Sequence, residues 1–529
     1  MNSDLEEKLR SYYGPNQYLN TLRHILETDG VLNKSQILFA EKLLITHVIK
    51  SDDLSLLPEE IILDFKTDWG KYTNKSPFEF QKQDINWLLN KERAILGLDM
   101  GLGKSLITTI AAIESQYKKI LIVCPASLKL NWRKEIETFA TSSDISILDK
   151  KFTPAKFTIV NYESLPKFLK EIEKHKFELV IGDEAHYCKN LQSKRTKNFT
   201  KIANKAKRVW LLTGTPIANK PIDFYSLLKI CKHELGKNKQ AYGEQFCGGI
   251  KTFFGWDFNG ASNLKRLHLK TKNVLLRRRK EDTLELPPKT RTPIYLELTN
   301  RKGYDNAVTE YLLKKQNELE AQLKLIEYEL TGSLKNKEYT DKLVELSVLR
   351  KFTALEKIKD RSLFELVDDI IDQGKKIVIF TNYLDVIDTV KEHYKDDCLT
   401  LDGRLSLEER NERIELFQSG KGPSIVVCNL AIASVGLTLT KACVAIMNDL
   451  SWSPSVMMQA EDRIFRIGQD QSVDILYPVY DNSIESIMFD VLKDKIFNIN
   501  QAIEGKTEGL SLTGDITNEV YNKLKLIRK

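Results

Sequence analysis

The sequence predicts an α/β protein with two parallel-sheet lobes, helical insertions and a small helical module at the N-terminus. Short β-branched runs alternate with amphipathic helical stretches, a pattern typical of βαβ units in buried parallel sheets. These runs fall into two blocks, about residues 78–290 and 355–500, which indicates two α/β domains. The length of 529 residues fits about three globular units at roughly 100–200 residues each.

Composition excludes several classes of protein. A hydrophobic content of 42% excludes a chain that is disordered overall. No apolar run approaches the roughly 18 residues that cross a bilayer, and the acidic, polar start Met1–Glu7 is unlike a secretory signal peptide. The seven cysteines form no C-x-x-C pair, so we expect buried free thiols in a reducing compartment. The net charge of +7 permits nucleic-acid binding without arguing for it.

Residues 1–75 carry apolar side chains at helical spacing, for example Leu19, Leu22 and Leu26, with a break at Asp29-Gly30. We expect a small helical accessory module here, with DNA contact as the alternative interpretation. Residues 76–290 are predicted to form the first lobe, with a helical insertion at about 222–275.

Strands are predicted in order along both blocks. In the first block the runs are Ala94–Leu98, Ile120–Cys124, Phe157–Val160, Leu179–Ile181 and Arg208–Leu212. In the second block, residues 355–500, the runs are Lys376–Phe380, Cys398–Leu401, Ser424–Cys428, Val444–Met447 and Val473–Tyr477.

The region between the blocks, residues 291–354, is predicted to be a helical hairpin inserted between the lobes. Two sets of apolar residues at helical spacing flank a turn-like Thr-Gly-Ser: Leu312, Leu319, Leu323, Ile326 and Leu330, then Leu343, Leu346 and Leu349. The basic segment 270–302 is interpreted either as a linker near phosphates or as a solvated turn. Residues 501–529 are predicted to be a C-terminal tail.

A phosphate-binding loop is predicted after the first strand. Ala94–Leu98 is followed by Asp99-Met100-Gly101-Leu102-Gly103-Lys104-Ser105 and then by a helix-like stretch. A glycine-bearing loop at a helix N-terminus directs backbone N–H groups at an anion. Lys104 is expected to reach the β- and γ-phosphates and the Ser105 hydroxyl to bind Mg²⁺. The first glycine of G-x-x-x-x-G-K-[ST] is replaced by Leu98.

Two carboxylates follow the apolar run Phe177–Ile181, in Gly182-Asp183-Glu184-Ala185-His186. Ligands of open parallel sheets bind at the carboxyl ends of the strands. Asp183 is therefore expected to hold Mg²⁺, through water, and Glu184 to orient and deprotonate the attacking water. In isolation, a solvated acidic turn would explain the same residues.

A third strand end and an arginine pair complete the predicted site. Thr213 and Thr215 follow the run Arg208–Leu212 and are expected to hydrogen-bond to the carboxylates, a simple strand-end turn being the alternative. Arg463 and Arg466 are three residues apart and share a helix face. If both point at the γ-phosphate held by the first block, they act as an arginine finger, which is worth about 10³–10⁵ in rate.

With these residues assembled, the chain resembles the Snf-type (SWI/SNF-family) DNA-translocating ATPases of helicase superfamily two, over roughly residues 76–500. In that family an acidic residue precedes Met-Gly-Leu-Gly-Lys, which accounts for the missing glycine. The matching blocks in order are Phe78-Glu79-Phe80-Gln81, Asp99–Ser105, Val123–Leu128 with Trp132, Asn161-Tyr162-Glu163, Lys189–Lys197, Leu401-Asp402-Gly403, Ser434–Leu439, Asn448–Pro454 and Arg463–Gln469. The stretches Phe254–Leu264, Leu275–Arg278 and Met457–Arg463 are similar to its annealing-helicase, fork-remodelling branch.

The resemblance implies two RecA-like lobes, an ATPase activity, and ATP and Mg²⁺ as cofactors. It implies that the nucleotide is bound by Gln81, Asp99, Met100, Gly101, Leu102, Gly103, Lys104, Ser105, Gly436 and Gln459, with Gln81 reading adenine. It implies DNA-backbone contacts at Ser127, Asn161 and Lys189 in the first lobe and at Asn382 and Gly436 in the second.

The function that the resemblance implies is ATP-driven translocation on double-stranded DNA, to remodel forks, anneal strands or displace bound proteins. A strand-separating DNA or RNA helicase and an ATP-gated DNA clamp with little turnover are the alternatives. Expected partners are double-stranded or forked DNA and a single-strand-binding or replication protein. No membrane association is expected, and the chain itself is expected to be a monomer. We expect an intracellular protein associated with DNA, either in the cytoplasm or nucleoid of a bacterium or an infected host, or in a nucleus.

Overall fold

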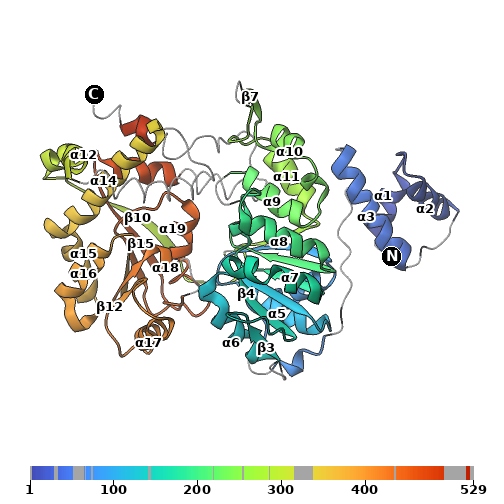
Figure 1. Cartoon of the computed structure of the whole chain (residues 1–529), viewed down its shortest axis with the longest axis horizontal. Coiled ribbons are helices and arrows are strands. Elements are labelled where there is room, and N and C mark those ends of the chain that lie inside the picture. Colours follow the sequence, from blue (N-terminus) through green and yellow to red (C-terminus); the bar gives the residue numbers. More distant parts are fainter. Residues whose placement is uncertain are drawn as a thin grey trace.

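The structure is a computed structural model. It describes residues 3–28, 32, 34–51, 65, 67–72, 76–140, 144–217, 220–252, 255–280, 282–284, 286–314, 337–433, 437–493 and 520–524. Within this part of the chain, two α/β lobes lie side by side and a small helical module lies beside the first lobe, on the side away from the second (Figure 1).

The first lobe is built on a seven-stranded sheet in which every paired strand is parallel, in the order β3-β4-β2-β5-β6-β1-β9. The strands are β1 (Arg93–Leu98), β2 (Ile120–Cys124), β3 (Ile145–Ile147), β4 (Phe157–Asn161), β5 (Leu179–Gly182), β6 (Arg208–Leu212) and β9 (Leu275–Arg278). The covering helices are α4 (Glu79–Leu89), α5 (Lys104–Glu114), α6 (Lys129–Phe139), α7 (Leu165–His175) and α8 (Lys194–Lys205).

Both faces of this sheet are buried, because its strands alternate their side chains between two apolar cores. Ile95 packs in one core with the insertion helices, and its neighbours Ala94 and Leu96 pack in the other. The insertion consists of α9 (Ile222–Ile230), α10 (Lys239–Phe246), the antiparallel hairpin of β7 (Ile250–Thr252) and β8 (Gly255–Asp257), and α11 (Leu264–Thr271).

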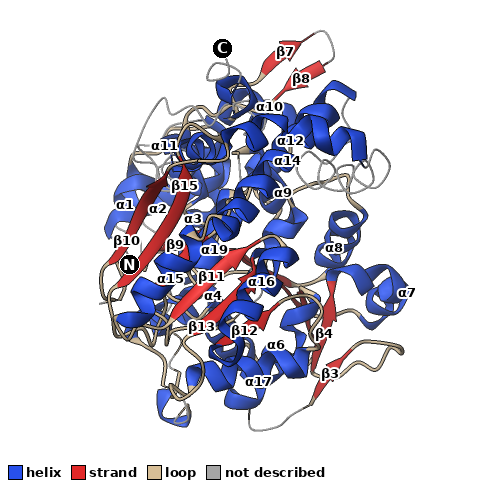
Figure 2. Cartoon of the chain, turned by 90° about the vertical axis from the view of Figure 1, so that its left-hand side faces the viewer, coloured by secondary structure: helices blue, strands red, loops and turns tan. Residues whose placement is uncertain are grey.

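The second lobe repeats this architecture with six parallel strands in the order β10-β15-β14-β11-β13-β12 (Figure 2). The strands are β10 (Lys289–Leu296), β11 (Ile377–Thr381), β12 (Cys398–Leu401), β13 (Ile425–Asn429), β14 (Val444–Met447) and β15 (Val473–Tyr480). The helices are α12 (Arg301–Lys314), α14 (Lys337–Lys359), α15 (Ser362–Asp372), α16 (Leu384–Tyr394), α17 (Leu407–Gln418), α18 (Leu430–Ala433) and α19 (Pro454–Glu461). Every run predicted as a strand forms one, which confirms the predicted fold class.

The basic segment 270–302 connects the two lobes and also contributes a strand to each. It contains β9, which pairs with β1 in the first lobe, and β10, which pairs with β15 in the second. Both are edge strands, and their residues are half-buried or exposed rather than fully buried. An apolar run does not mark such strands, so the sequence pattern missed them. The same segment therefore completes both sheets.

The region between the blocks joins the second lobe. Helices α12 and α14 contact each other, and Tyr304, Leu346 and Leu349 pack in the core of the second sheet. Leu343 is also buried. Leu319, Leu323, Ile326 and Leu330 lie outside the described residues. The described part of the predicted tail, Val520 to Leu524, packs on the same core.

The N-terminal module has an apolar core of its own. Its helices are α1 (Ser3–Arg10), α2 (Gln17–Glu27) and α3 (Lys34–Ser51). Leu19, Leu22 and Leu26 are buried in that core, as the helical spacing predicts. Helix α3 contacts the turn Glu234–Gly236 of the first lobe.

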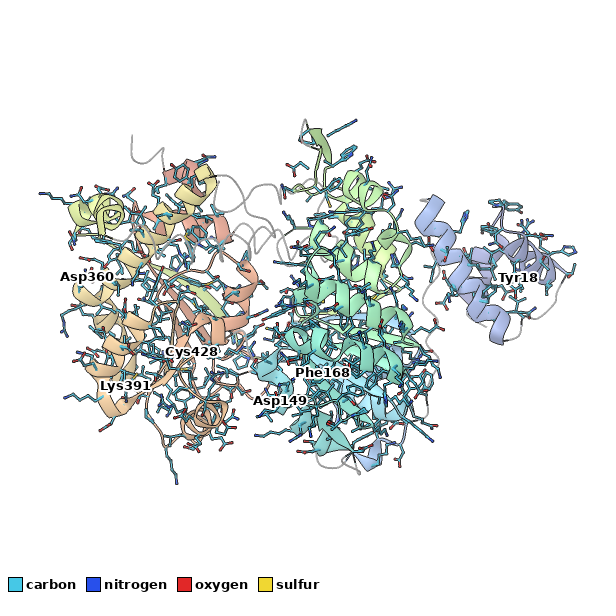
Figure 3. The ribbon with its side chains drawn as sticks, viewed as in Figure 1. Tyr18, Asp149, Phe168, Asp360, Lys391 and Cys428 are labelled. Atoms are coloured by element: carbon cyan, nitrogen blue, oxygen red, sulfur yellow. The ribbon has the colours of Figure 1, made fainter. Side chains whose placement is uncertain are left out.

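The seven cysteines are buried and free, in agreement with the prediction; Cys428, on β13, is one of them (Figure 3). Across the described residues, no helix combines the length and the apolar character that a membrane span requires.

Candidate nucleotide site

The loop between β1 and α5 turns at two glycines with left-handed backbones. Gly101 and Gly103 have φ angles of +86° and +82°, which side chains with a Cβ rarely adopt. A Cβ at Gly103 would lie 2.4 Å from Gln81 Nε2, and one at Gly101 would lie 2.8 Å from Arg466 Cβ in the second lobe. The glycines therefore permit both the turn of the loop and the close approach of the other lobe.

Lys104 begins helix α5 and points back into this loop. Its Nζ donates to the carbonyl oxygens of Leu98 at 2.8 Å and Asp99 at 3.3 Å. Burial lowers the pKa of Lys104, whereas the charges of Glu184 and Asp183 raise it. The ammonium thus lies in a half-buried site that faces two carboxylates, as a group that binds β- and γ-phosphates should. Ser105 follows it in the first turn of α5.

Asp99 stabilises the base of the loop. Its carboxylate pairs with Arg277 Nη2 at 2.7 Å and accepts from the backbone N–H of Lys280 at 3.1 Å. Burial raises the pKa of Asp99, but Arg277 and Lys280 outweigh burial and hold it below the ordinary value. Arg277 also donates to the carbonyl of Gly97 at 2.6 Å. The acidic residue that replaces the usual loop pattern therefore ties β1 to β9.

Gln81 is buried beneath the loop. Its Nε2 donates to the carbonyl of Leu102 at 3.1 Å, and its Oε1 accepts from the backbone N–H of Phe78 at 3.0 Å. Both ends of the amide are occupied by protein groups in this structure, so Gln81 supports the loop. Its contact with adenine remains a prediction.

Asp183 is fixed by three groups at the end of β5. Trp132 Nε1 donates to Asp183 Oδ2 at 2.8 Å, and the backbone N–H of Glu184 donates to Oδ1 at 2.9 Å. The Tyr162 hydroxyl donates to the carbonyl of Asp183 at 2.8 Å. Burial, and then the adjacent charge of Glu184, raises the pKa of Asp183 to about 6.

Glu184 has a left-handed backbone, with φ at 50°, which is unusual for a residue with a side chain. Its side chain is buried, and Oε2 lies 3.2 Å from His186 Nδ1. Burial raises the pKa of Glu184, but His186, Lys104 and Arg463 together lower it below the ordinary value. His186, Lys104 and Arg463 thus favour the ionised form of this carboxylate, which is the form that can accept a proton.

Thr213 and Thr215 follow the carboxyl end of β6, and β6 lies between β5 and β1. Thr213 Oγ1 lies 3.3 Å from His186 Nδ1 and accepts from the backbone N–H of Thr215 at 3.1 Å. In this structure His186 lies between Thr213 and Glu184, so Thr213 contacts the imidazole in place of a carboxylate. The predicted hydrogen bonds of the two threonines to the carboxylates stay a prediction. The Thr215 hydroxyl is buried and has no partner among the described residues.

The arginine pair of the second lobe lies against this loop. Arg463 is buried, with Nη2 3.6 Å from Met100 Sδ and Nε donating to the carbonyl of Gln459 at 3.1 Å. Arg466 Nη1 donates to the carbonyl of Leu437 at 3.0 Å. Burial, and then the neighbouring charge of Arg466, lowers the pKa of Arg463 to about 10. Burial likewise lowers the pKa of Arg466.

A second set of ionic contacts surrounds the arginine segment. Lys280 Nζ of the first lobe pairs with Asp462 Oδ1 at 2.7 Å and donates to the carbonyl of Phe465 at 2.5 Å. Within the second lobe, Lys289 and Arg291 pair with the fully buried Glu461 at 3.1 and 2.6 Å. Burial raises the pKa of Glu461, but these two cations outweigh burial and bring it to about 2.

The residues predicted to contact DNA follow strand ends in both lobes. Ser127 lies in the turn after β2, Lys189 in the turn after β5, and Asn161 ends β4 with its Nδ2 donating to Glu163 at 3.1 Å. Asn382 follows β11 and donates through its backbone and side chain to Asp449. Gly436 lies outside the described residues.

Sequence reasoning missed four residues that build the site: Trp132, Arg277, Lys280 and Asp462. Trp132 stands within a matched block, yet only the fold brings it to Asp183, 51 residues away. Arg277 and Lys280 lie in the basic segment 270–302, and the charge of that segment does not reveal their partners Asp99 and Asp462. Asp462 precedes Arg463 directly, so its place in the arginine block was a usable signal.

Substitution of Trp132 by Phe tests the support of Asp183. The Phe side chain keeps an aromatic ring in the core but removes the hydrogen bond to a carboxylate that is predicted to bind Mg²⁺. We expect the Mg²⁺ concentration needed for half-maximal ATPase activity to rise about 10–100-fold, the usual effect of losing an outer-shell partner. Trp87→Phe, at another buried tryptophan, is the control and should leave the Mg²⁺ requirement unchanged. An unchanged requirement in Trp132→Phe would contradict this support.

The donor set fits a magnesium ion that is shared with phosphates. In the described part of the chain, no group of three or more His, Cys, Asp or Glu side chains could hold a metal by itself. Mg²⁺ usually binds through one or two carboxylates together with substrate phosphates and water. Asp183 and the Ser105 hydroxyl, near Lys104, meet that requirement.

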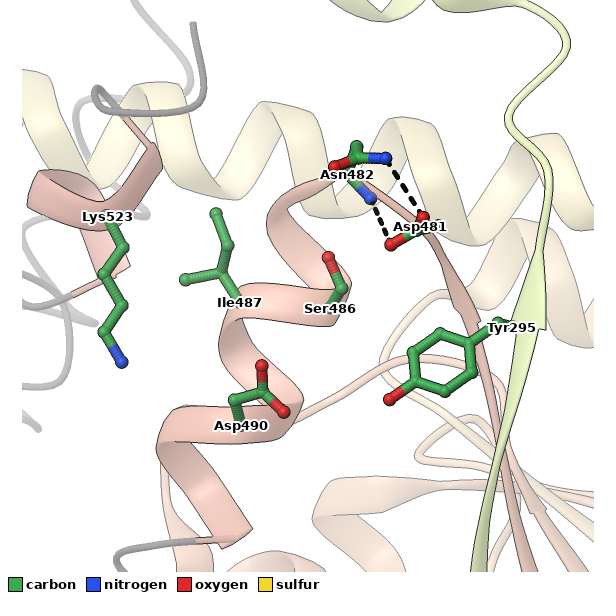
Figure 4. A pocket seen from close by; sticks show the side chains of 7 residues that line it. All are labelled: Tyr295, Asp481, Asn482, Ser486, Ile487, Asp490 and Lys523. Atoms are coloured by element: carbon green, nitrogen blue, oxygen red, sulfur yellow. Dashed lines mark hydrogen bonds between the residues drawn. The ribbon is translucent and has the colours of Figure 1, made fainter.

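A cavity of about 680 Å³ lies elsewhere in the second lobe (Figure 4). It is lined by Tyr295, Asp481, Asn482, Ser486, Ile487, Asp490 and Lys523. Asp481 follows the end of β15, whereas Arg466 precedes the start of that strand. The cavity is therefore separate from the nucleotide site.

Comparisons with known proteins relate this chain to a family. The model of the SNF2-related domain matches residues 80–357, and that of the helicase conserved C-terminal domain matches residues 359–468. A solved structure of the SWI2/SNF2 ATPase core of Sulfolobus solfataricus in complex with dsDNA is 22% identical, covers 86% of this chain and 97% of its own, and has a TM-score of 0.39.

Three relatives show the range of similar proteins. The SWI/SNF-related matrix-associated actin-dependent regulator of chromatin subfamily A-like protein 1 of Xenopus tropicalis is 28% identical over 86% of this chain and 50% of its own. An uncharacterized ATP-dependent helicase of Mycoplasma pneumoniae is 30% identical over 88% and 45%. The human DNA annealing helicase and endonuclease ZRANB3 is 28% identical over 81% and 40%. This chain spans about half the length of these relatives. It belongs to the SNF2-related family of helicase-like ATPases.

Proposed function

We propose that this protein is a DNA-dependent ATPase that moves on double-stranded DNA, and that it remodels forks, anneals strands or displaces bound proteins. The observation that carries the proposal is the contact of Arg463 and Arg466, from the second lobe, with the phosphate loop of the first. The guanidinium of Arg463 lies against a lysine-bearing loop, and the Cβ of Arg466 approaches the same loop at Gly101. Guanidinium and ammonium groups gathered in this way suit a polyanion. Hydrolysis there depends on the relative position of the lobes.

The chain's own residues supply the steps of hydrolysis. Lys104 and the backbone of the loop bind the phosphates, and Glu184 orients the attacking water and accepts its proton. Arg463 and Arg466 stabilise the charge that develops on the transferred phosphoryl group. Mg²⁺, held by Asp183 and Ser105, would neutralise the negative charge of the β- and γ-phosphates.

Coupling to movement follows from the position of the arginines. ATP binds groups from both lobes and so favours the closed arrangement, whereas the products lack the γ-phosphate that the arginines contact. A ligand shifts such an equilibrium by its differential affinity for the two states. DNA held by both lobes would favour closure as well, so ATP and DNA should each strengthen the binding of the other.

Phosphate-binding groups near Lys189 support DNA as the polymer. Ser193 caps α8, and Lys194 and Lys197 are exposed in its first turn. Arg195 lies 4.9 Å from the ring of Tyr187 and pairs with Glu163 at 2.9 Å. Cations at a helix N-terminus contact backbone phosphates and carry no sequence information. The relative named as a DNA annealing helicase supports the same polymer.

The ATPase rate with different nucleic acids tests this proposal. Under one salt condition, duplex and forked DNA should raise the rate well above the DNA-free rate, and RNA should raise it less. The stimulation should fall steeply with added salt, because each neutralised phosphate releases counterions. A rate that no DNA raises would contradict the translocase function.

Two further assays separate the alternatives. Displacement of a triplex-forming strand without unwinding of a tailed duplex is expected of a translocase, whereas unwinding of the tailed duplex would indicate a strand-separating helicase. Steady-state phosphate release that stays negligible with every DNA would indicate an ATP-gated clamp.

A further inference from the structure

Lys280 connects the two lobes at the nucleotide site. It follows β9, an edge strand of the first lobe, and the residue is only 3% exposed. Its ammonium contacts Asp462 Oδ1 at 2.7 Å and the carbonyl of Phe465 at 2.5 Å. Asp462 immediately precedes Arg463, and Phe465 immediately precedes Arg466. Through Lys280, the first lobe therefore binds the segment that carries both arginines.

The other end of Lys280 is bound to the phosphate loop. Its backbone N–H donates to Asp99 Oδ2 at 3.1 Å, and Asp99 Oδ1 pairs with Arg277 at 2.7 Å. Its Cε lies 3.5 Å from the position that a Cβ on Gly101 would occupy. One residue thus joins the base of the phosphate loop to the arginine segment.

The contact of Lys280 with Asp462 is not needed to neutralise that carboxylate, because a second lysine is near it. Lys289 lies 4.0 Å from the same carboxylate oxygen and also pairs with Glu461. Lys289 belongs to β10, in the sheet of the second lobe, so its contacts stay within that lobe. Those of Lys280 cross between the lobes. A buried ammonium is costly unless it is paired, and these two partners are available to Lys280 only while the arginine segment lies on the loop.

We propose that Lys280 is a positioning residue for ATP hydrolysis, which holds Arg463 and Arg466 against the phosphate loop when the lobes close. The inference rests on the proposed ATPase function and names the device that aligns its arginines. Lys280 acts through its contacts with Asp462 and Phe465 and does not touch the reacting phosphate.

Lys280→Met tests the proposal, because a positioning role should lower kcat and leave KM for ATP nearly unchanged. Misplacement of a catalytic group by about 1 Å can cost about 100-fold in rate. With saturating duplex DNA, we expect kcat to fall about 10–100-fold, and KM for ATP and the affinity for DNA to change less than about threefold. The control is Lys207→Met, which removes a lysine from an exposed ion pair with Glu178 at 3.0 Å and should keep the wild-type kcat.

The same substitution in a protein without the two arginines distinguishes positioning of the arginines from general stabilisation of the fold. In protein that carries Arg463→Ala and Arg466→Ala, Lys280→Met should lower single-turnover hydrolysis no further, because there are no guanidinium groups left to position. A further loss of the full size would overturn the proposal. Asp462→Asn, which keeps the side-chain size, removes the charge that pairs with Lys280 and should reproduce the fall in kcat even if Lys280→Met does not fold.

The outcomes separate the two proposals. If the wild-type protein hydrolyses no ATP with any DNA, the proposed function fails. If the wild-type protein is active and both Lys280→Met and Asp462→Asn retain its kcat, the proposed function stands and the positioning role of Lys280 is overturned.

Discussion

Glu184→Gln is expected to abolish turnover while ATP and DNA binding are retained. The amide has nearly the same shape as the carboxylate but cannot accept a proton from the attacking water. General-base catalysis contributes about 10²–10⁴ in rate, so phosphate release in the presence of DNA should fall by that factor. The local structure favours this role, since the net pKa of Glu184 is lowered by His186, Lys104 and Arg463 against the effect of burial.

The experiment compares Glu184→Gln with Glu173→Gln, which alters an exposed ion pair with Lys205 in the same lobe. The control should retain both activity and binding. Equilibrium binding of a fluorescent ATP analogue and of duplex DNA then shows whether the site is intact. Near-normal hydrolysis by Glu184→Gln would show that another group is the base.

Arg466→Ala is expected to remove hydrolysis with little change in nucleotide affinity. An arginine finger acts on charge that develops in the transition state, and its loss costs about 10³–10⁵ in kcat. Lys104 and the backbone of the loop, which bind the ground-state phosphates, are unaffected. Arg463→Ala should lower kcat in the same direction and also release the second lobe from Met100.

Steady-state kinetics and nucleotide binding measure this effect, with Arg301→Ala as the control. Arg301 forms an ion pair with Asp305 on the surface of the second lobe, at 3.3 Å. A variant Arg466→Ala that hydrolyses ATP normally and binds DNA poorly would place Arg466 on the DNA surface instead of at the phosphate.

The strands and the phosphate loop could be predicted from the sequence because each is a local pattern. A buried parallel strand such as β2 is a continuous apolar run, and the loop between Asp99 and Ser105 carries its glycines, lysine and serine within a few residues. The arginine pair was identified in the same way. The expectation that the pair points at the γ-phosphate held by the first lobe depended on how the two lobes meet, and the structure brings Arg463 against Met100 of the phosphate loop.

The supporting contacts could not be predicted because they join distant segments. Trp132 and Asp183 follow different strands, and the sheet order β2-β5 brings them together. The edge strands β9 and β10 carry charged side chains, so their pattern resembled a linker. Thr213 was expected to contact the carboxylates, but the ring of His186 fills that space, which spacing along the chain does not show.

The central claim is that the first lobe binds ATP and the second lobe supplies the arginines for its hydrolysis. The most direct measurement compares the affinity for ADP–aluminium fluoride, which mimics the transferred phosphoryl group, with the affinity for a non-hydrolysable ATP analogue. Transition-state analogues bind more tightly only where groups act on the transition state. In the presence of duplex DNA, the wild-type protein should bind ADP–aluminium fluoride far more tightly than the ATP analogue. Protein that carries Arg463→Ala and Arg466→Ala should lose this preference and retain the ATP analogue. The same preference in both proteins would contradict the claim.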